Sequence, residues 1–177
     1  MILNLKRTPG IYLAGFMGSG KSIIGRLLAD ELGWNFSDLD EEIEQQEHTT
    51  IAEIFDTRGE AAFREIESAA LRQRVRTIES GRPYVVALGG GAFLSEANAD
   101  LVLNHGVTVW VDCPLSLIER RVASETHRPL ARDLEKLRHL YEERRSSYAR
   151  AHYRIEVGGD DPTFAVAQIM SLPLFSP

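Results

Sequence analysis

The octet Gly15-Phe16-Met17-Gly18-Ser19-Gly20-Lys21-Ser22 has the pattern G-x-x-x-x-G-K-S of a phosphate-binding loop. Its glycines let the backbone curl with the N–H groups facing inward. Lys21 can then reach the β- and γ-phosphates, and the Ser22 hydroxyl can hold Mg²⁺. A turn that binds nothing would not require Lys and Ser at the start of a helix, where the helix dipole favours an anion. The octet therefore predicts a nucleoside triphosphate site.

The sequence around the loop has the alternation of an α/β protein. The apolar run 11–14 precedes the loop, and apolar residues at helical spacing follow it as far as Gly33. Strands separated by helical patterns imply a parallel sheet with helices on both faces, which makes three layers. The five expected strands are Ile11–Ala14, Trp34–Ser37, Tyr84–Leu88, Val107–Val111 and Arg154–Val157.

Two segments depart from this alternation. Residues 40–80 have helical patterns only, which predicts a helical insertion that binds the substrate at the sheet edge. The apolar pattern fails from 124 to 133, which suggests a lid. We expect one domain over 1–177, with its core at 1–39, 80–123 and 132–177, the insertion at about 40–79 and the lid at about 124–131.

Composition restricts the partners. The chain of 177 residues has a net charge of −6, which argues against a general nucleic-acid or membrane-surface binder. The stretch from Ile118 to Arg154 is basic, however, and suits a small anionic ligand. Cys113 is the only cysteine, so an internal disulfide is impossible and a reducing cytoplasm is the expected location. We find no signal or membrane-spanning segment and expect a monomer.

The sequence Asp38-Leu39-Asp40 follows the second expected strand. Alternation along a strand would direct both carboxylates to one side, at the edge where open α/β sheets bind ligands. One carboxylate could serve a metal and the other a substrate. The alternative is that either aspartate only caps the helix that follows, which does not account for both.

Glycines and arginines supply the remaining candidates. Gly89-Gly90-Gly91 removes every Cβ at the end of the third strand, as a ligand lying against the backbone would require. Arg64 and Glu67 are spaced as a surface ion pair. Guanidinium forks suited to phosphate or carboxylate are present at Arg128, Arg144 and Arg145, and spacing does not distinguish their roles. These residues indicate an ATP-dependent phosphotransferase with a small, anionic acceptor.

The ordered motifs resemble the shikimate kinase family. Besides the loop, D-x-D and G-G-G, the chain has 51–55 (I-A-E-I-F), 59–60 (G-E), 63–67 (F-R-E-I-E), 128–130 (R-P-L) and Arg144 with Tyr148 (R-x-x-x-Y). The resemblance covers most of the chain and implies the P-loop kinase fold. It also implies transfer of phosphate from ATP to the 3-hydroxyl of shikimate, with Mg²⁺, on the route to chorismate and aromatic amino acids.

The resemblance also implies a role for each matching residue. Lys21, Asp40 and Arg128 would be catalytic, and Ser22 and Asp38 would serve the metal. The expected cofactor-binding residues are Gly18, Ser19, Gly20, Lys21, Ser22, Ile23, Arg121 and Arg128, with Arg121 against adenine. The expected substrate-binding residues are Asp40, Arg64, Gly89, Gly90, Gly91 and Arg144, with the two arginines facing the carboxylate.

The chain departs from the family pattern locally. His48 stands where the family usually has Gly, Ser146-Ser147 replaces Pro-Leu, and the stretch 130–137 is shortened. Two other interpretations remain open from the residues. One is another small kinase of the same architecture, such as a gluconate or nucleoside monophosphate kinase. The other is a non-catalytic nucleotide-binding module, for which paired acceptor and lid residues would be unnecessary.

Overall fold

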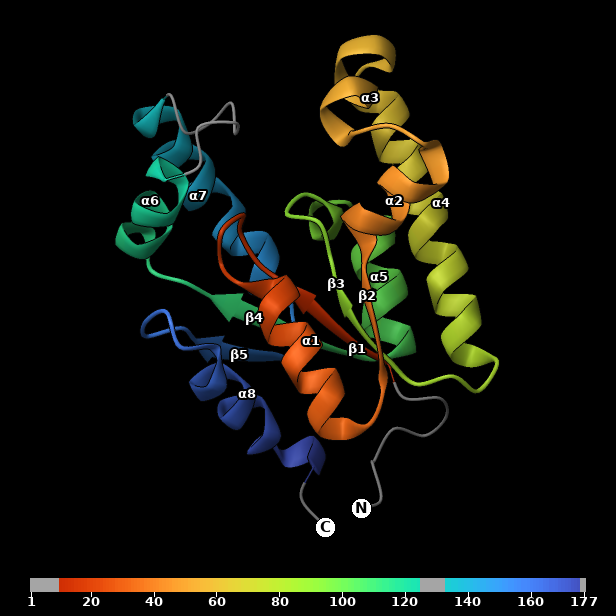
Figure 1. The fold of residues 1–177 in the computed structure, drawn as a ribbon, viewed down its shortest axis with the longest axis vertical. Coiled ribbons are helices and arrows are strands. Elements are labelled where there is room, and N and C mark those ends of the chain that lie inside the picture. Colours follow the sequence, from red (N-terminus) through yellow and green to blue (C-terminus); the bar gives the residue numbers. More distant parts are fainter. Residues whose placement is uncertain (1–9, 125–132, 176–177) are drawn as a thin grey trace.

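The protein folds around one parallel β-sheet, as Figure 1 shows in a computed structural model that describes residues 10–124 and 133–175. The strand order is β2-β3-β1-β4-β5. The predicted α/β class is therefore confirmed. The strands are β1 (Gly10–Ala14), β2 (Asn35–Asp38), β3 (Tyr84–Ala87), β4 (Val107–Asp112) and β5 (Tyr153–Glu156).

Helices cover both faces of this sheet (Figure 1). On one face α1 and α8 pack against each other, and on the other α5 packs against β4 and α4. The helices outside the insertion are α1 (Lys21–Leu32), α5 (Glu96–His105), α6 (Leu115–Ala123), α7 (Leu134–Tyr148) and α8 (Pro162–Met170), and the 3-10 turns are η1 (Ala92–Leu94) and η3 (Pro173–Phe175).

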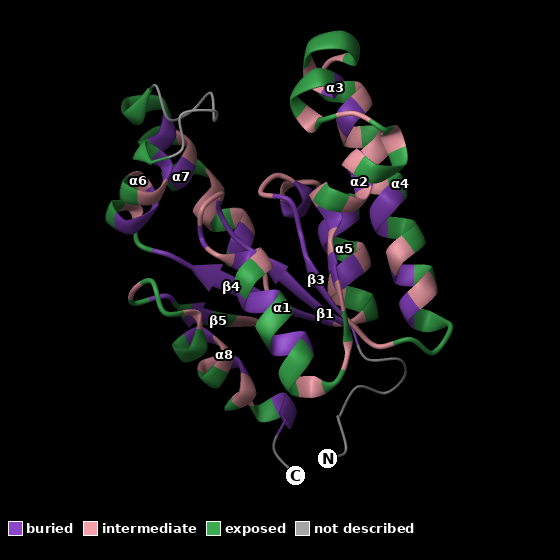
Figure 2. Cartoon of the chain, in the orientation of Figure 1, coloured by how far each residue is buried: buried purple, intermediate pink, exposed green. Residues whose placement is uncertain are grey.

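The core lies on the central strands. Every residue of β1 and β4 is buried, because each strand has a neighbour on both sides and helices above and below it (Figure 2). The edge strand β5 buries only Ile155, so it lacks this continuous apolar character. The central strands are thus rigid supports for the loops at their carboxyl ends.

The segment between β2 and β3 contains helices only: α2 (Leu39–Glu47), α3 (Ile51–Arg58) and α4 (Glu60–Glu79). A capping box starts α3, in which the Thr50 side chain accepts from the Glu53 backbone and Glu53 returns the contact. In Figure 1 these helices rise on the opposite side of the sheet's carboxyl edge from α6 and α7. Segments distant in sequence therefore flank that edge from two sides.

All five strands lie within one residue of their predicted bounds, but one small shift matters. Strand β2 ends at Asp38 and α2 begins at Leu39, so the strand alternation that we expected to orient Asp40 does not reach it. Asp40 is placed by the first turn of a helix instead. Residues 125–131 of the predicted lid, Arg128 among them, lie outside the described residues. Within the described ranges no helix is long and apolar enough to cross a membrane.

Candidate active site

The phosphate-binding loop has the backbone that its glycines predict. Gly15, Gly18 and Gly20 have φ values of 153°, 73° and 93°, where L side chains are strained. A Cβ on Gly15 would also lie 2.6 Å from the Val111 carbonyl oxygen of β4. Gly20 is the N-cap of α1, so the helix begins at Lys21 and its free N–H groups face the loop. The loop and helix together form a site suited to an anion.

Lys21 lies against its own loop. Its ammonium donates to the carbonyl oxygens of Gly15 at 2.7 Å and Phe16 at 2.9 Å, and lies 3.5 Å from the buried Ser19 hydroxyl. The residue is only 9% exposed. These contacts hold one positive charge at the centre of the loop.

The Ser22 hydroxyl donates a hydrogen bond to Asp38 Oδ2. Asp38 Oδ1 accepts the backbone N–H groups of Asp40 at 3.0 Å and Glu41 at 3.2 Å, so the same carboxylate also caps α2. Capping and a contact with the loop serine are therefore not alternatives for Asp38. The hydroxyl and the carboxylate are hard oxygen donors of the kind Mg²⁺ prefers, and the small number of protein ligands fits an ion that keeps several waters. The described residues contain no cluster of three or more His, Cys, Asp or Glu arranged for a metal.

Asp40 is a half-buried carboxylate among other acids. Its Oδ1 atom is buried and has no hydrogen-bond partner. Burial, together with the nearby charges of Asp38 and Glu67, raises the pKa of Asp40 to about 6, and Lys21 opposes this. A carboxylate in such an environment is suited to accept a proton near neutral pH.

The triple glycine lies where the site side chains converge. A Cβ on Gly89 would lie 2.7 Å from Asp40 Oδ1, and one on Gly91 would lie 2.5 Å from both terminal nitrogens of Arg64. At Gly90 the nearest atoms would be Arg144 Nη1 and the Met17 backbone nitrogen, both at 3.6 Å. None of the three has a positive φ, so close approach explains Gly89 and Gly91, whereas a Cβ on Gly90 would make only ordinary contacts.

Arg64 is anchored by Glu67. Its Nη1 donates to Glu67 Oε1 at 2.8 Å, and Nη2 lies 3.5 Å from Glu60 Oε1. The predicted surface ion pair is wrong for Glu67, which is only 1% exposed. Burial raises the pKa of Glu67, whereas Arg64 and Arg144 lower it. Arg64 is thus held by a buried carboxylate beside the glycines.

Arg144 approaches the same place from α7. Its guanidinium lies 5.8 Å from the Phe16 ring centre, and its Nε is buried without a hydrogen-bond partner. One turn later the Tyr148 hydroxyl donates to the Gly90 carbonyl at 2.6 Å. Burial raises the pKa of Tyr148 to about 12, so it stays protonated as a donor. The spacing of Arg144 and Tyr148 therefore places both side chains on the glycine side of the helix.

Arg121 and Ile23 are the remaining cofactor-binding candidates among the described residues. Arg121 Nη1 donates to the Gly18 carbonyl at 2.7 Å, and Nη2 donates to the Gly159 carbonyl at 3.2 Å and Asp160 at 3.4 Å. Arg121 thus bridges the phosphate-binding loop and the segment after β5. Ile23 lies in the first turn of α1 and is 61% exposed. Cys113 is buried, as expected for a structural thiol.

The comparison with known proteins agrees with these features. A family model described as shikimate kinase matches residues 17–172. The chain belongs to the shikimate kinase family. A shikimate kinase of Persephonella marina is 37% identical to it over 161 residues, which cover 90% of this chain and 96% of that protein. The predicted family and P-loop kinase fold are confirmed.

Solved structures support the same assignment. Shikimate kinase from Acinetobacter baumannii in complex with shikimate has a TM-score of 0.86 and 36% identity, covering 94% of this chain and 93% of that one. A gluconokinase from Sinorhizobium meliloti has a TM-score of 0.52 and 18% identity, covering 93% and 95%. The second likeness shows the fold alone, and the rival gluconate kinase interpretation gains no support from it.

In this member of the shikimate kinase family, most of the predicted site residues lie around one end of the sheet. The loop, the two aspartates, Arg64, the triple glycine and Arg144 come together, whereas Arg121 contacts the loop at Gly18 and Ile23 is exposed in the first turn of α1. The burial of Glu67 and the hydrogen bond made by Tyr148 were not predicted from the sequence. Both belong to the shikimate kinase motifs, and that was their only signal in the sequence.

Proposed function

We propose that the protein transfers the γ-phosphoryl group of ATP to the 3-hydroxyl of shikimate, giving shikimate 3-phosphate and ADP on the route to chorismate. The observation that carries this proposal is a pair of buried, unpartnered polar atoms: Asp40 Oδ1, which lies beside Gly89, and the Nε of Arg144, whose Nη1 lies beside Gly90. Leaving polar atoms buried and unpaired is unfavourable unless a ligand satisfies them. A hydroxylated carboxylic acid supplies both complements: a hydroxyl for Asp40 and a carboxylate for the arginine.

The acceptor's carboxylate would bind between Arg64 and Arg144, which come from α4 and α7. Guanidinium groups bind carboxylates with paired hydrogen bonds, so two of them define the position of a small acid closely. Glu67 would keep Arg64 in place through its 2.8 Å contact. Gly89, Gly90 and Gly91 would let the ring lie against the backbone, because no Cβ fills that space.

The nucleotide would bind along the loop and the start of α1. Backbone N–H groups of Gly18, Ser19 and Gly20 would receive the phosphates, Lys21 would leave its loop carbonyls for the β- and γ-phosphates, and Arg121 would face adenine. We assign Ile23 and Arg128 to this site from the family motifs, although Arg128 lies outside the described residues. Ser22 would bind Mg²⁺, and Asp38 would orient it. When bound, the metal neutralises charge on the phosphates.

Catalysis would depend on position and charge. Phosphoryl transfer has a loose transition state, so a strong base is unnecessary. Asp40, with its raised pKa, would hold the acceptor hydroxyl and take its proton as the oxygen–phosphorus bond forms. Lys21 and Arg128 would stabilise the charge that develops on the transferring group. We also propose that the enzyme works as a cytoplasmic monomer.

The decisive experiment measures ADP release with ATP, Mg²⁺ and a panel of acceptors. Shikimate should support turnover, whereas gluconate, nucleoside monophosphates and buffer alone should not. Shikimate methyl ester keeps the ring and hydroxyls but lacks the charge, so it should lose at least 100-fold in kcat/KM if the arginines bind the carboxylate. Preference for gluconate would mean that the protein is a gluconate kinase. No turnover with any acceptor would favour a non-catalytic module.

Arg144→Ala tests the acceptor site directly. It should raise KM for shikimate at least tenfold and leave KM for ATP within twofold, because Arg144 lies at the glycines, whereas Arg121 is the arginine that contacts the loop at Gly18. Equal effects on both KM values would instead indicate a disturbed fold.

A further inference from the structure

Helix α7 carries Arg144 but has a small apolar contact with the rest of the protein. Of its fifteen residues only Leu137, Tyr141 and Tyr148 are buried. These side chains seat one face of the helix on the core, and Tyr141 and Tyr148 also donate to the carbonyls of Cys113 and Gly90. The direction of Arg144 depends on these contacts together with the other polar contacts that α7 makes.

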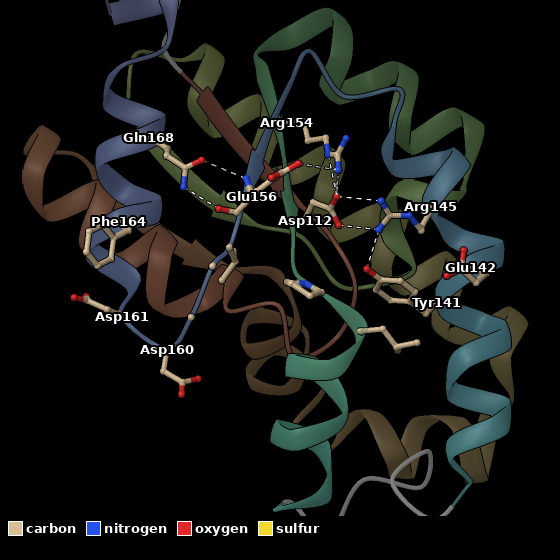
Figure 3. Close-up of a pocket in the computed structure, with 15 residues that line it drawn as sticks. Asp112, Tyr141, Glu142, Arg145, Arg154, Glu156, Asp160, Asp161, Phe164 and Gln168 are labelled. Carbon is tan, nitrogen blue, oxygen red and sulfur yellow. Dashed lines mark hydrogen bonds and ion pairs between the residues drawn. The ribbon is translucent and has the colours of Figure 1, made fainter.

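The strongest of these contacts is made by Arg145. Its Nη1 and Nη2 donate to the two carboxylate oxygens of Asp112, at 2.8 Å and 3.1 Å, and Nη1 also donates to the Tyr141 hydroxyl at 2.8 Å (Figure 3). The guanidinium stacks 4.9 Å from the Trp110 ring centre. Asp112 is the last residue of β4, and its side chain is only 8% exposed. A two-pronged bond to an enclosed carboxylate allows little rotation.

We propose that Asp112 and Arg145 are positioning residues for the acceptor, which lock the rotation of α7 so that Arg144 faces the triple glycine. This inference rests on the proposed role of Arg144. Neighbouring residues on a helix point about 100° apart. Fixing Arg145 against β4 therefore fixes where Arg144 points, toward Phe16 and Gly90.

Asp112 also offers a matched control. Arg154 of β5 donates to Asp112 Oδ2 with its Nε at 2.9 Å and lies 5.0 Å from the Trp110 ring centre, so its contacts parallel those of Arg145 (Figure 3). Unlike Arg145, it bonds only the Oδ2 atom of Asp112 and also pairs with Glu156 at 3.2 Å, and it ties Asp112 to the edge strand rather than to α7. Arg145→Gln and Arg154→Gln each remove one guanidinium from Asp112, but only the first releases the helix.

The test compares the two variants by steady-state kinetics and thermal unfolding. Arg145→Gln should raise KM for shikimate five- to twentyfold, with KM for ATP within twofold, while Arg154→Gln keeps both within twofold. Arg145→Lys keeps the charge but not the forked guanidinium, so its KM for shikimate should lie between those of Arg145→Gln and Arg154→Gln. Asp112→Asn should match Arg145→Gln, and combining the two should add nothing further. Equal KM values for shikimate in Arg145→Gln and Arg154→Gln would overturn the proposal, whatever the melting temperatures.

A second measurement separates this inference from the proposed function. Amide hydrogen exchange over residues 137–148 should be at least fivefold faster in Arg145→Gln than in Arg154→Gln, with no substrate present. If shikimate proved not to be the acceptor but α7 exchanged faster, the locking of α7 by Asp112 and Arg145 would stand, and the acceptor assignment would fail. An unchanged exchange rate over residues 137–148 in Arg145→Gln would refute the locking of α7, even if the enzyme phosphorylates shikimate.

Discussion

Ser22 and Asp38 are joined by a hydrogen bond between α1 and the end of β2, and the same carboxylate caps α2 with its other oxygen. The phosphate-binding loop and the first helix of the insertion are thereby attached to one side chain. Any movement of Asp38 would disturb the proposed metal site and the placement of Asp40 together.

Asp38→Asn should weaken the use of Mg²⁺ without unfolding the protein. Asn caps a helix about as well as Asp, so the free energy of unfolding should change by less than about 0.5 kcal/mol. Loss of the charge beside Ser22 should lower activity roughly 10- to 100-fold at limiting Mg²⁺, with partial recovery at high Mg²⁺. A Mg²⁺ titration of kcat, with chemical denaturation as the stability control, checks both halves. An unchanged Mg²⁺ requirement would mean that Asp38 only caps α2.

Asp40→Asn should lower kcat about 10²- to 10⁴-fold, because an amide cannot take the acceptor's proton, and added Mg²⁺ should not restore it. In the wild type, kcat/KM should decline as the pH falls below about 6, where Asp40 becomes protonated. The variant should lack that decline. Measuring kcat/KM from pH 5 to 8 for both proteins is sufficient, and a wild-type profile flat through pH 6 would assign the proton to another group.

The same variant should gain stability relative to the wild type as the pH rises from 4 to neutral. Because burial raises the pKa of Asp40 above its unfolded value, its contribution to stability is complete below about pH 4 and is lost as the pH rises through 6. Relative to wild type, Asp40→Asn should therefore gain up to about 3 kcal/mol between pH 4 and 6 and then level off. Urea unfolding at four pH values measures this gain. A constant difference would mean that Asp40 has an ordinary pKa.

Gly91→Ala should damage acceptor binding more than stability. The new Cβ would meet the flexible end of Arg64 at 2.5 Å and displace it from the proposed carboxylate site. We expect KM for shikimate to rise about tenfold, equivalent to roughly 1.4 kcal/mol, with a small change in melting temperature. Gly158→Ala, where nothing lies within 4 Å of the added Cβ, should leave KM for shikimate unchanged. An unchanged KM for shikimate in Gly91→Ala would mean that Arg64 does not bind the acceptor.

His48→Gly should stabilise the protein. Among the described residues, His48 is the only non-glycine with a positive φ, 54°, at the C-terminal end of α2. A side chain there costs roughly 1–2 kcal/mol, and glycine avoids most of that cost. The melting temperature should rise by roughly 2–4 °C. His48→Ala keeps the Cβ and serves as the control, so an equal rise in both variants would point to the imidazole and not the backbone.

The sequence alone identified the phosphate-binding loop and all five strands to within one residue. These features depend on neighbours along the chain: glycines where φ is positive, and apolar runs where a strand is covered on both faces. The sequence could not show that β2 stops at Asp38, because the change from strand to helix depends on the capping contacts of that side chain.

Only the tertiary structure decided which polar residues are buried and paired. Glu67 looks like an exposed helical acid in the sequence, yet it is enclosed beside Arg64, and Arg145 looks interchangeable with Arg144 until Asp112 is placed against it. Burial and pairing join residues far apart in the chain, such as Gly90 with Tyr148 and Asp112 with Arg145. Local sequence patterns determine where helices and strands form, whereas the pKa of Asp40 and the direction of each arginine follow from how those elements pack.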